Sequence, residues 1–177
     1  MTTIIGLTGY TGCGKSALGD LLERKNRGVK HYGMSEALLR RFLLARPSIL
    51  PGFPITSVDE LHELKRKHPA LREAIQDFGM AFRQIDTDIW VKAVLFDIYN
   101  DKRTDYAIVS GIRFENEREM CDHVVGICRP GYGPVNGHAS ETGTAACLEA
   151  ADITINNTGT LQELYETFET HFPGVSV

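Results

Sequence analysis

The chain has 177 residues, a length that corresponds to one domain with a substantial hydrophobic core. It is 42% hydrophobic and 24% charged, close to the average for folded proteins, which excludes a disordered chain. The formal net charge of −4 disfavours long nucleic acids and anionic membranes as partners, but it is compatible with a small anionic ligand held by local cations.

The first half of the chain predicts a strand, a glycine loop and a helix, followed by a second strand and several helices. β-Branched runs indicate the strands, and apolar residues three and four apart indicate the helices. Pro47–Pro54, with three prolines and Gly52, is expected to end one helix. The expected strands are residues 3–8 and 29–33. One helix is expected to follow Lys15, and another to begin at Pro69. Three more are expected to begin at capping residues: Ser35, Ser57 in a capping box with Glu60, and Asp88.

In the second half, strands are expected at residues 106–110, 123–128 and 152–155. Thr160 with Glu163 reads as a capping box at the start of the last helix. Strands alternating with helices predict an α/β fold, with a central parallel sheet of about five strands flanked by helices. We expect a single domain, residues 1–177. It has two excursions from the sheet, a helical one at about residues 46–86 and a mobile lid at about residues 129–147.

The lid is expected because four glycines and two prolines lie between Pro130 and Gly143, in a polar segment that follows a strand. Arg129, His138 and Glu141 are its candidate functional residues. The alternative is an ordered surface loop in which His138 and Glu141 satisfy local hydrogen bonds.

The four cysteines form no Cys-x-x-Cys pair, and the apolar stretch after Met1 ends too early for a signal peptide. No apolar run approaches the roughly 20 residues of a membrane-spanning helix. We therefore expect a protein of the reducing cytoplasm, with neither a membrane nor a polymeric nucleic acid as partner. The spacings of the cysteines, and of His62 and His68, match no common metal site.

Residues 9–16, the phosphate loop, match the pattern G-x-x-x-x-G-K-S and lie between an expected strand and an expected helix. The glycines let backbone N–H groups point at a phosphate chain, and the helix N-terminus adds partial positive charge. Lys15 is expected to reach the β and γ phosphates, and the Ser16 hydroxyl to ligate magnesium. The predicted nucleoside triphosphate site comprises Gly9, Tyr10, Thr11, Gly12, Cys13, Gly14, Lys15, Ser16 and Ala17.

The phosphate loop does not identify the acceptor of the phosphate. The chain has no N-K-x-D stretch and no D-x-x-G after a strand, so a signalling GTPase is disfavoured. A small-molecule kinase must gather positive charge around two phosphate groups, beyond the carboxyl ends of the strands. Lys65, Arg66 and Lys67 resemble an exposed helix face instead. The candidate arginines are Arg40, Arg41, Arg46, Arg83, Arg113 and Arg129.

Several segments, in order from residue 4 to about residue 165, together resemble the bacteriophage deoxynucleoside monophosphate kinases, a branch of the nucleoside monophosphate kinase superfamily. The phosphate loop and the arginine-to-tryptophan segment are specific by themselves. The segments are the phosphate loop; Ser35-x-x-x-Leu39-Arg40; Gly79-x-x-x-Arg83-x-x-Asp86-x-Asp88-x-Trp90-Val91; Arg113-Phe114-x-Asn116-Glu117; His138-Ala139-Ser140-Glu141; and Ala151-Asp152-x-x-Ile155-x-Asn157-x-Gly159-x-Leu161.

The resemblance implies a P-loop kinase that transfers the γ-phosphate of ATP to a deoxynucleoside 5′-monophosphate, with magnesium, in the cytoplasm of the host if the source is viral. A homodimer is compatible with it. Lys15, Arg83 and Arg113 look catalytic, and the acceptor phosphate looks bound by Arg40, Arg83 and Arg113. Trp90 and Glu117 look like contacts to the sugar or base. Otherwise Trp90 is a core residue and Glu117 is paired on a helix surface.

The sequence departs from the common family pattern in two places. Many members have Asp-Thr after the loop lysine, where this chain has Ser16-Ala17, and an Asp often precedes the R-F-x-N-E segment, where Gly111 and Ile112 stand here. No carboxylate for magnesium is therefore identified. Two other functions stay open: a kinase like those of dephospho-coenzyme A, which share the N-x-G-x-L pattern, and a non-catalytic ATP-binding module.

Overall fold

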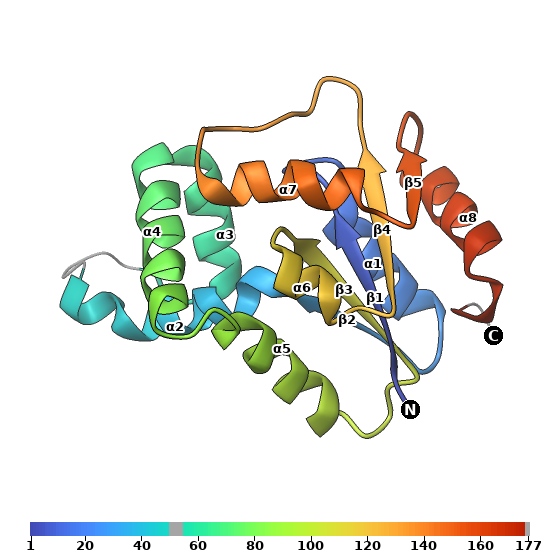
Figure 1. Ribbon diagram of the computed structural model, residues 1–177, viewed down its shortest axis with the longest axis horizontal. Coiled ribbons are helices and arrows are strands. Elements are labelled where there is room, and N and C mark those ends of the chain that lie inside the picture. Colours follow the sequence, from blue (N-terminus) through green and yellow to red (C-terminus); the bar gives the residue numbers. More distant parts are fainter. Residues whose placement is uncertain (50–54, 176–177) are drawn as a thin grey trace.

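The computed structural model describes residues 1–49 and 55–175. Within them, five strands form one parallel sheet in the order β2-β3-β1-β4-β5, which lies at the centre of the molecule (Figure 1). This confirms the expected α/β class. The strands are β1 (Thr3–Thr8), β2 (Val29–Gly33), β3 (Tyr106–Ile112), β4 (His123–Cys128) and β5 (Ile153–Asn156).

Neighbouring residues of a strand point to opposite faces of the sheet. Apolar strand residues therefore lie on both faces, and helices cover both. Ile5 and Leu7 pack with α1 (Lys15–Lys25) and α8 (Leu161–His171). Ile4 and Val109 face the other way. They pack with α2 (Met34–Ile49), α5 (Ile89–Asn100) and α7 (Ala139–Glu149), near the short α6 (Glu115–Glu119). A 3-10 turn, Pro173–Val175, follows α8.

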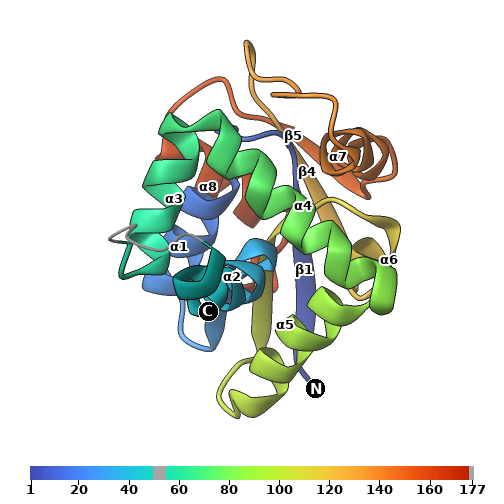
Figure 2. The ribbon, with the colours of Figure 1, turned by 90° about the vertical axis from the view of Figure 1, so that its left-hand side faces the viewer.

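A second, smaller core lies beside the sheet, where α3 (Val58–Lys67) and α4 (Pro69–Ile85) pack against α2. The two helices lie together at the left of the molecule in Figure 1 and face the viewer in Figure 2. Leu61 of α3 and Ile75 of α4 are buried there against Phe42 of α2. These helices occupy the segment where the sequence predicted a helical excursion.

Both boundaries of α2 and the cap of α5 differ in detail from the sequence prediction. α2 continues two residues past Pro47, because a proline near the end of a helix removes a hydrogen bond with little helix left to disrupt. The rest of the expected break, residues 50–54, lies outside the described residues. Ser35 lies inside α2 rather than capping it. Asp88 is at the cap position of α5, but its carboxylate accepts from the Asn116 amide at 2.9 Å instead of from the helix.

The expected lid segment contains a packed helix, α7, in its second half. Glu141 and Thr144 of this helix are buried, so the expectation of a polar loop as far as Gly143 is wrong. A Cβ at Gly143 would lie 2.1 Å from the Arg113 carbonyl oxygen, so this glycine permits close packing rather than motion. Among the residues described, no helix has both the length and the apolar character needed to cross a membrane.

Candidate active site

The phosphate loop joins β1 to α1 and depends on glycine at its turns. Gly12 and Gly14 have φ angles of 87° and 109°, in the left-handed region that side chains rarely adopt. A Cβ at Gly14 would also lie 2.7 Å from the side-chain nitrogen of Asn157. That nitrogen donates a buried hydrogen bond of 2.9 Å to the Cys13 carbonyl. The closing segment of the chain therefore holds the loop in shape.

Lys15 is the first residue of α1, and its ammonium donates hydrogen bonds to the phosphate loop itself. Its Nζ donates to the Tyr10 carbonyl oxygen at 2.7 Å and to the buried Cys13 thiol at 3.3 Å. Burial lowers the pKa of Lys15. A phosphate oxygen would be a stronger acceptor for this ammonium than either neutral partner, so the lysine is placed to exchange them for a nucleotide.

A cavity of about 230 Å³ extends from the phosphate loop to α3 and α4. Thr11, Gly12, Lys15 and Ser16 line one end, and Leu38, Met80 and Phe114 provide apolar surface elsewhere. Glu117 is the one acidic residue among the described residues that line the cavity. The excess of positive charge suits an anionic ligand. The basic lining residues are Lys15, Lys65, Arg66, Arg72, Arg83 and Arg113.

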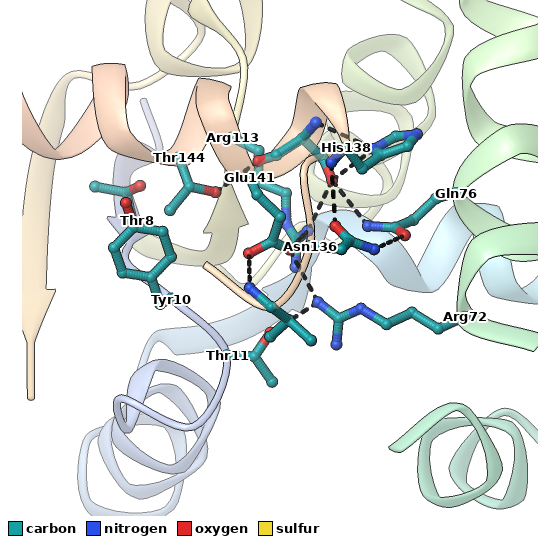
Figure 3. Close-up of polar contacts among 12 residues, drawn as sticks. Thr8, Tyr10, Thr11, Arg72, Gln76, Arg113, Asn136, His138, Glu141 and Thr144 are labelled. Carbon is teal, nitrogen blue, oxygen red and sulfur yellow. Dashed lines mark hydrogen bonds and ion pairs between the residues drawn. The ribbon is translucent and has the colours of Figure 1, made fainter. Parts of the chain in front are cut away.

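The buried carboxylate of Glu141 holds two of these arginines beside the phosphate loop (Figure 3). One of its oxygens lies 2.9 Å from Nη2 of Arg72 and 3.4 Å from Nη1 of Arg113. Arg72 also donates to the Thr11 hydroxyl at 3.3 Å, and its Nε is buried with no hydrogen-bond partner among the described residues. α4, α7 and the phosphate loop therefore meet at one point.

A second buried carboxylate, Glu117, holds Arg83. Its other oxygen accepts from the main-chain N–H groups of Arg113 at 2.8 Å and Phe114 at 3.3 Å. The Arg83 guanidinium also lies 4.1 Å from the centre of the Phe114 ring. Burial raises the pKa of Glu117. Both carboxylate oxygens of Glu117 already accept hydrogen bonds. In this structure Glu117 therefore holds the Arg83 side chain and the Arg113 main chain, and neither oxygen is free to accept from a nucleobase.

Lys65 faces the cavity, which corrects the expectation that it belongs to an exposed helix face. Burial, with repulsion from Arg113 and Arg72, lowers its pKa to about 8. One turn earlier on α3, burial lowers the pKa of His62 to about 4, so this cavity-lining imidazole is neutral at physiological pH. Arg66 lines the rim but is largely exposed and pairs with Glu63.

Trp90 and His138 line the cavity, as their expected roles require. Only 2% of Trp90 is exposed, and its indole N–H donates to the Gly79 carbonyl at 3.1 Å. His138 caps α7 by accepting from the main chain of Ser140. Arg129 is exposed and lies over Tyr132, outside the cavity lining. The site roles of these residues stay predictions.

Arg40 does not reach the cavity, and its expected contact with the acceptor phosphate is corrected. Its side chain is 54% exposed and pairs with Glu36 and Asp97 on the outer surface. On α2 it is two positions after the cavity-lining Leu38, a rotation of roughly 200°. It lines a separate surface hollow with Lys92.

Sequence reasoning missed Arg72 and Lys65, although a signal for Arg72 was present. Arg72, Gln76, Gly79 and Arg83 are spaced by four, three and four residues, so they share one face of α4. The family-like arginine, Arg83, thus marks a helix face on which other cavity residues can be found. Lys65 belongs to a charge run whose neighbours do face solvent.

Magnesium fits this site through Ser16. In the part of the chain that the structure describes, no group of three or more His, Cys, Asp or Glu side chains could hold a metal ion. Magnesium in nucleotide sites keeps several waters and binds one or two protein groups together with phosphate oxygens. A hydroxyl at the start of α1, beside the phosphate positions, meets that requirement.

Solved structures similar to this chain share its fold. A Thermus thermophilus protein, TT1252, has a TM-score of 0.55 at 15% identity, covering 99% of both chains. Dephospho-CoA kinase from Campylobacter jejuni has a TM-score of 0.54 at 14% identity over 99% of this chain and 98% of its own. Shikimate kinase from Aquifex aeolicus has a TM-score of 0.50 at 17% identity over 97% of both. At these identities the likeness establishes a P-loop kinase fold alone.

No curated protein sequence matches the chain significantly. The family model for deoxynucleotide monophosphate kinase matches residues 54–168, well over half of the chain. The match begins after the phosphate loop, so it is independent of that motif, and it includes α4, Arg113 and Glu141. The chain therefore belongs to the deoxynucleotide monophosphate kinase family.

Proposed function

We propose that the protein transfers the γ-phosphoryl group of ATP to the 5′-phosphate of a deoxynucleoside monophosphate, giving ADP and a deoxynucleoside diphosphate. The observation that carries the proposal is the division of the cavity. Lys15 and Ser16 line the cavity at the phosphate loop, Arg83 lies against the Phe114 ring, and Arg113 lines the cavity beside both. Family membership supports a nucleotide kinase, and the second set of cations supports an anionic acceptor.

Phosphoryl transfer needs the donor and acceptor in line, with the charge on the transferring oxygens neutralised. Lys15 binds the β and γ phosphates of ATP, and Ser16 contributes its hydroxyl to magnesium. Magnesium supplies further neutralisation of the phosphates when bound. Arg83 and Arg113 bind the acceptor phosphate, and Arg72 adds a charge between the two ends of the cavity. No general base is required, because the acceptor is already an anionic phosphate.

An assay of ADP release tests this function on a panel of deoxynucleoside and ribonucleoside monophosphates plus dephospho-coenzyme A, each with ATP and magnesium. We expect release with one or more deoxynucleoside monophosphates. Release with dephospho-coenzyme A alone would contradict the proposal and favour the alternative kinase. Tight ATP binding without turnover on any acceptor would favour a non-catalytic ATP-binding module.

The remaining expectations for this protein stay predictions: a cytoplasmic location, a small-molecule partner and a homodimer. Phe96 and Tyr99 of α5 are large side chains, both more than two thirds exposed. Light scattering of the purified protein measures the oligomeric state directly, and a monomer mass would contradict the homodimer.

A further inference from the structure

Three polar residues from separate elements form a hydrogen-bonded chain that ends at the cavity. Asp20 of α1 lies 2.7 Å from Nδ1 of His31, which is on β2. Nε2 of the same imidazole lies 2.8 Å from the hydroxyl of Ser110 on β3. Asp20 faces solvent, whereas the His31 side chain is 11% exposed and Ser110 is 5% exposed. The chain therefore connects an exposed carboxylate to a nearly buried hydroxyl.

For a neutral imidazole, the order of partners sets the direction of the hydrogen bonds. A carboxylate only accepts, so Nδ1 of His31 carries the proton that points to Asp20. In the neutral imidazole Nε2 is then the acceptor, and the Ser110 hydroxyl donates its proton to it. The lone pairs of Ser110 are left for a cation or for a water that donates. A phosphate oxygen, itself an acceptor, is not a suitable partner for this oxygen.

Ser110 lies on the strand next to the one that leads into the phosphate loop. It is near the carboxyl end of β3 and pairs in register with Leu7 of β1, two residues before the phosphate loop begins. Ser110 and Gly111 line the same cavity as Lys15 and Ser16. The hydroxyl-bearing side chains of Ser110 and Ser16 therefore line one cavity, each from an element next to β1.

The packing around His31 shows that the imidazole has a dedicated place. Gly19 lies inside α1, and a Cβ there would come within 2.4 Å of the His31 ring. Glycine inside a helix costs about 1 kcal/mol relative to alanine. The main-chain N–H of His31 is held as well, by the Glu23 carboxylate at 3.0 Å. The ring therefore packs directly against Gly19 of α1, and Glu23 holds the main chain beside it.

We propose that Ser110, held as an acceptor by His31 and Asp20, contacts the magnesium ion of bound MgATP or one of its waters. This inference rests on the proposed function, because it requires that MgATP be the donor. The Ser110 hydroxyl would be the second protein oxygen for magnesium, in a chain where Gly111 and Ile112, not a carboxylate, stand directly before Arg113. His31 and Asp20 are positioning residues that act through Ser110.

Calorimetry tests the proposal by measuring two dissociation constants for each variant, one for MgATP and one for ATP in the presence of a chelator. The ratio of ATP to MgATP dissociation constants isolates the contribution of the metal. In Ser110→Ala we expect this ratio to fall about tenfold, equivalent to about 1.4 kcal/mol, with metal-free ATP affinity unchanged. Asp20→Asn should lower the ratio less, because an amide lets the imidazole adopt either tautomer.

Glu23→Gln is the matched control. Glu23 is also on α1 and bonded to His31, and the substitution changes the net charge equally, but it contacts the main chain rather than the ring. Its ratio should equal that of the wild type. If Ser110→Ala folds poorly, the exposed Asp20→Asn provides the same comparison.

An unchanged ratio in Ser110→Ala and Asp20→Asn would overturn this proposal alone. Equal weakening of ATP and MgATP would do the same, because it would place Ser110 on a phosphate. A phosphoryl adduct on Ser110 after incubation with MgATP, detected by mass spectrometry, would identify the hydroxyl as a nucleophile and also overturn it. Failure of the wild type to bind MgATP would overturn the proposed function as well.

Discussion

The Glu141 carboxylate lies 2.9 Å from the Arg72 guanidinium, and this buried ion pair joins α7 to α4 beside the phosphate loop. Because the same carboxylate also reaches Arg113, one negative charge balances two arginines. Phosphate is the other kind of anion that such a pair of guanidiniums binds well. The two helices that carry these residues are thus coupled to each other and to whatever anion enters the cavity.

Glu141→Gln is expected to destabilise the protein, because it leaves the nearly buried Arg72 and the partly buried Arg113 without the counter-charge of Glu141. Breaking a buried pair costs about 3 kcal/mol in the free energy of unfolding. Urea denaturation measures the change. Glu63→Gln, which removes the exposed partner of Arg66, is the control and should cost less than about 1 kcal/mol. Equal losses in the two variants would show that Glu141 is not a structural counter-charge.

Lys15→Met should leave the fold intact and lower turnover by at least about 100-fold, because the ammonium stabilises charge that develops on the phosphates. Circular dichroism checks the fold, and steady-state ADP release measures turnover. Lys25→Met, on the last turn of the same helix, is the control and should keep full activity. Near-normal turnover in a folded Lys15→Met protein would show that the loop is not catalytic.

Arg83→Ala should weaken the deoxynucleoside monophosphate roughly 10-fold to 100-fold and leave ATP affinity nearly unchanged, as expected for loss of a charged hydrogen bond. It also leaves Glu117 buried without its ion-pair partner. The double variant Arg83→Ala with Glu117→Gln should therefore recover stability but not affinity. Calorimetric titration with each ligand separates these effects.

Arg40→Ala provides the matched comparison for Arg83, because it removes an arginine that the sequence predicted to bind the same phosphate. Its surface position predicts unchanged affinity for the monophosphate. Loss of affinity in Arg40→Ala, or equal weakening of both nucleotides in Arg83→Ala, would contradict the placement of the acceptor phosphate.

Monophosphate binding should weaken above pH 8, where Lys65 loses its charge. With a pKa of about 8, this lysine is mostly charged at pH 7 and mostly neutral at pH 9, so the dissociation constant should rise by up to about tenfold across that range. Lys65→Met should flatten this dependence. Equal pH dependence of the dissociation constant in both proteins would show that Lys65 does not contribute to monophosphate binding.

The stability contribution of Lys65 has the opposite sign. Its ordinary pKa is 10.5, so between pH 8 and that value the unfolded chain binds more protons than the folded one. The free energy of unfolding should therefore rise with pH, relative to Lys65→Met. Urea denaturation across this range checks the sign.

Residues 130–137 should gain protection from hydrogen exchange when both nucleotide sites are filled, whereas α7 should be protected in both states. The loop meets the rest of the site through Asn136, which donates to Gln76 at 3.1 Å, and through Tyr132, which lies against Gly12. Exchange measured with and without a bisubstrate analogue checks this. Equal protection of the loop in both states would contradict the prediction that it acts as a lid.

The sheet and the phosphate loop could be predicted from the sequence because their signals are local. β-Branched residues mark β1 and β4 to the residue, and the capping box of Thr160 and Glu163 marks the start of α8. The Gly9–Ser16 pattern encodes its own turn and the helix that follows it. In such segments, neighbouring residues determine the structure.

The rest of the site depends on contacts between distant residues. α7 carries the weak helix formers Ser140, Thr142 and Gly143, and it is stable because the fold buries one of its faces. The pairing of Arg72 with Glu141 joins positions 69 residues apart, which no local pattern reveals. The sequence motif places Arg40 correctly along α2, but a motif does not show which face of a helix lines a cavity, and Arg40 lies on the outer face.

β1 lies in the middle of the sheet, yet both of its neighbours come from far along the chain: Thr3 pairs with Tyr106, and Ile5 with His123. Bringing such distant segments together is slow, because a long loop must close before any contact forms. During synthesis the phosphate loop leaves the ribosome early, but its supporting strand stays unpaired until β3 has emerged, and it gains its second neighbour only with β4. ATP binding is therefore expected to be among the last properties the growing chain acquires, and the apolar β1 depends on protection from aggregation until then.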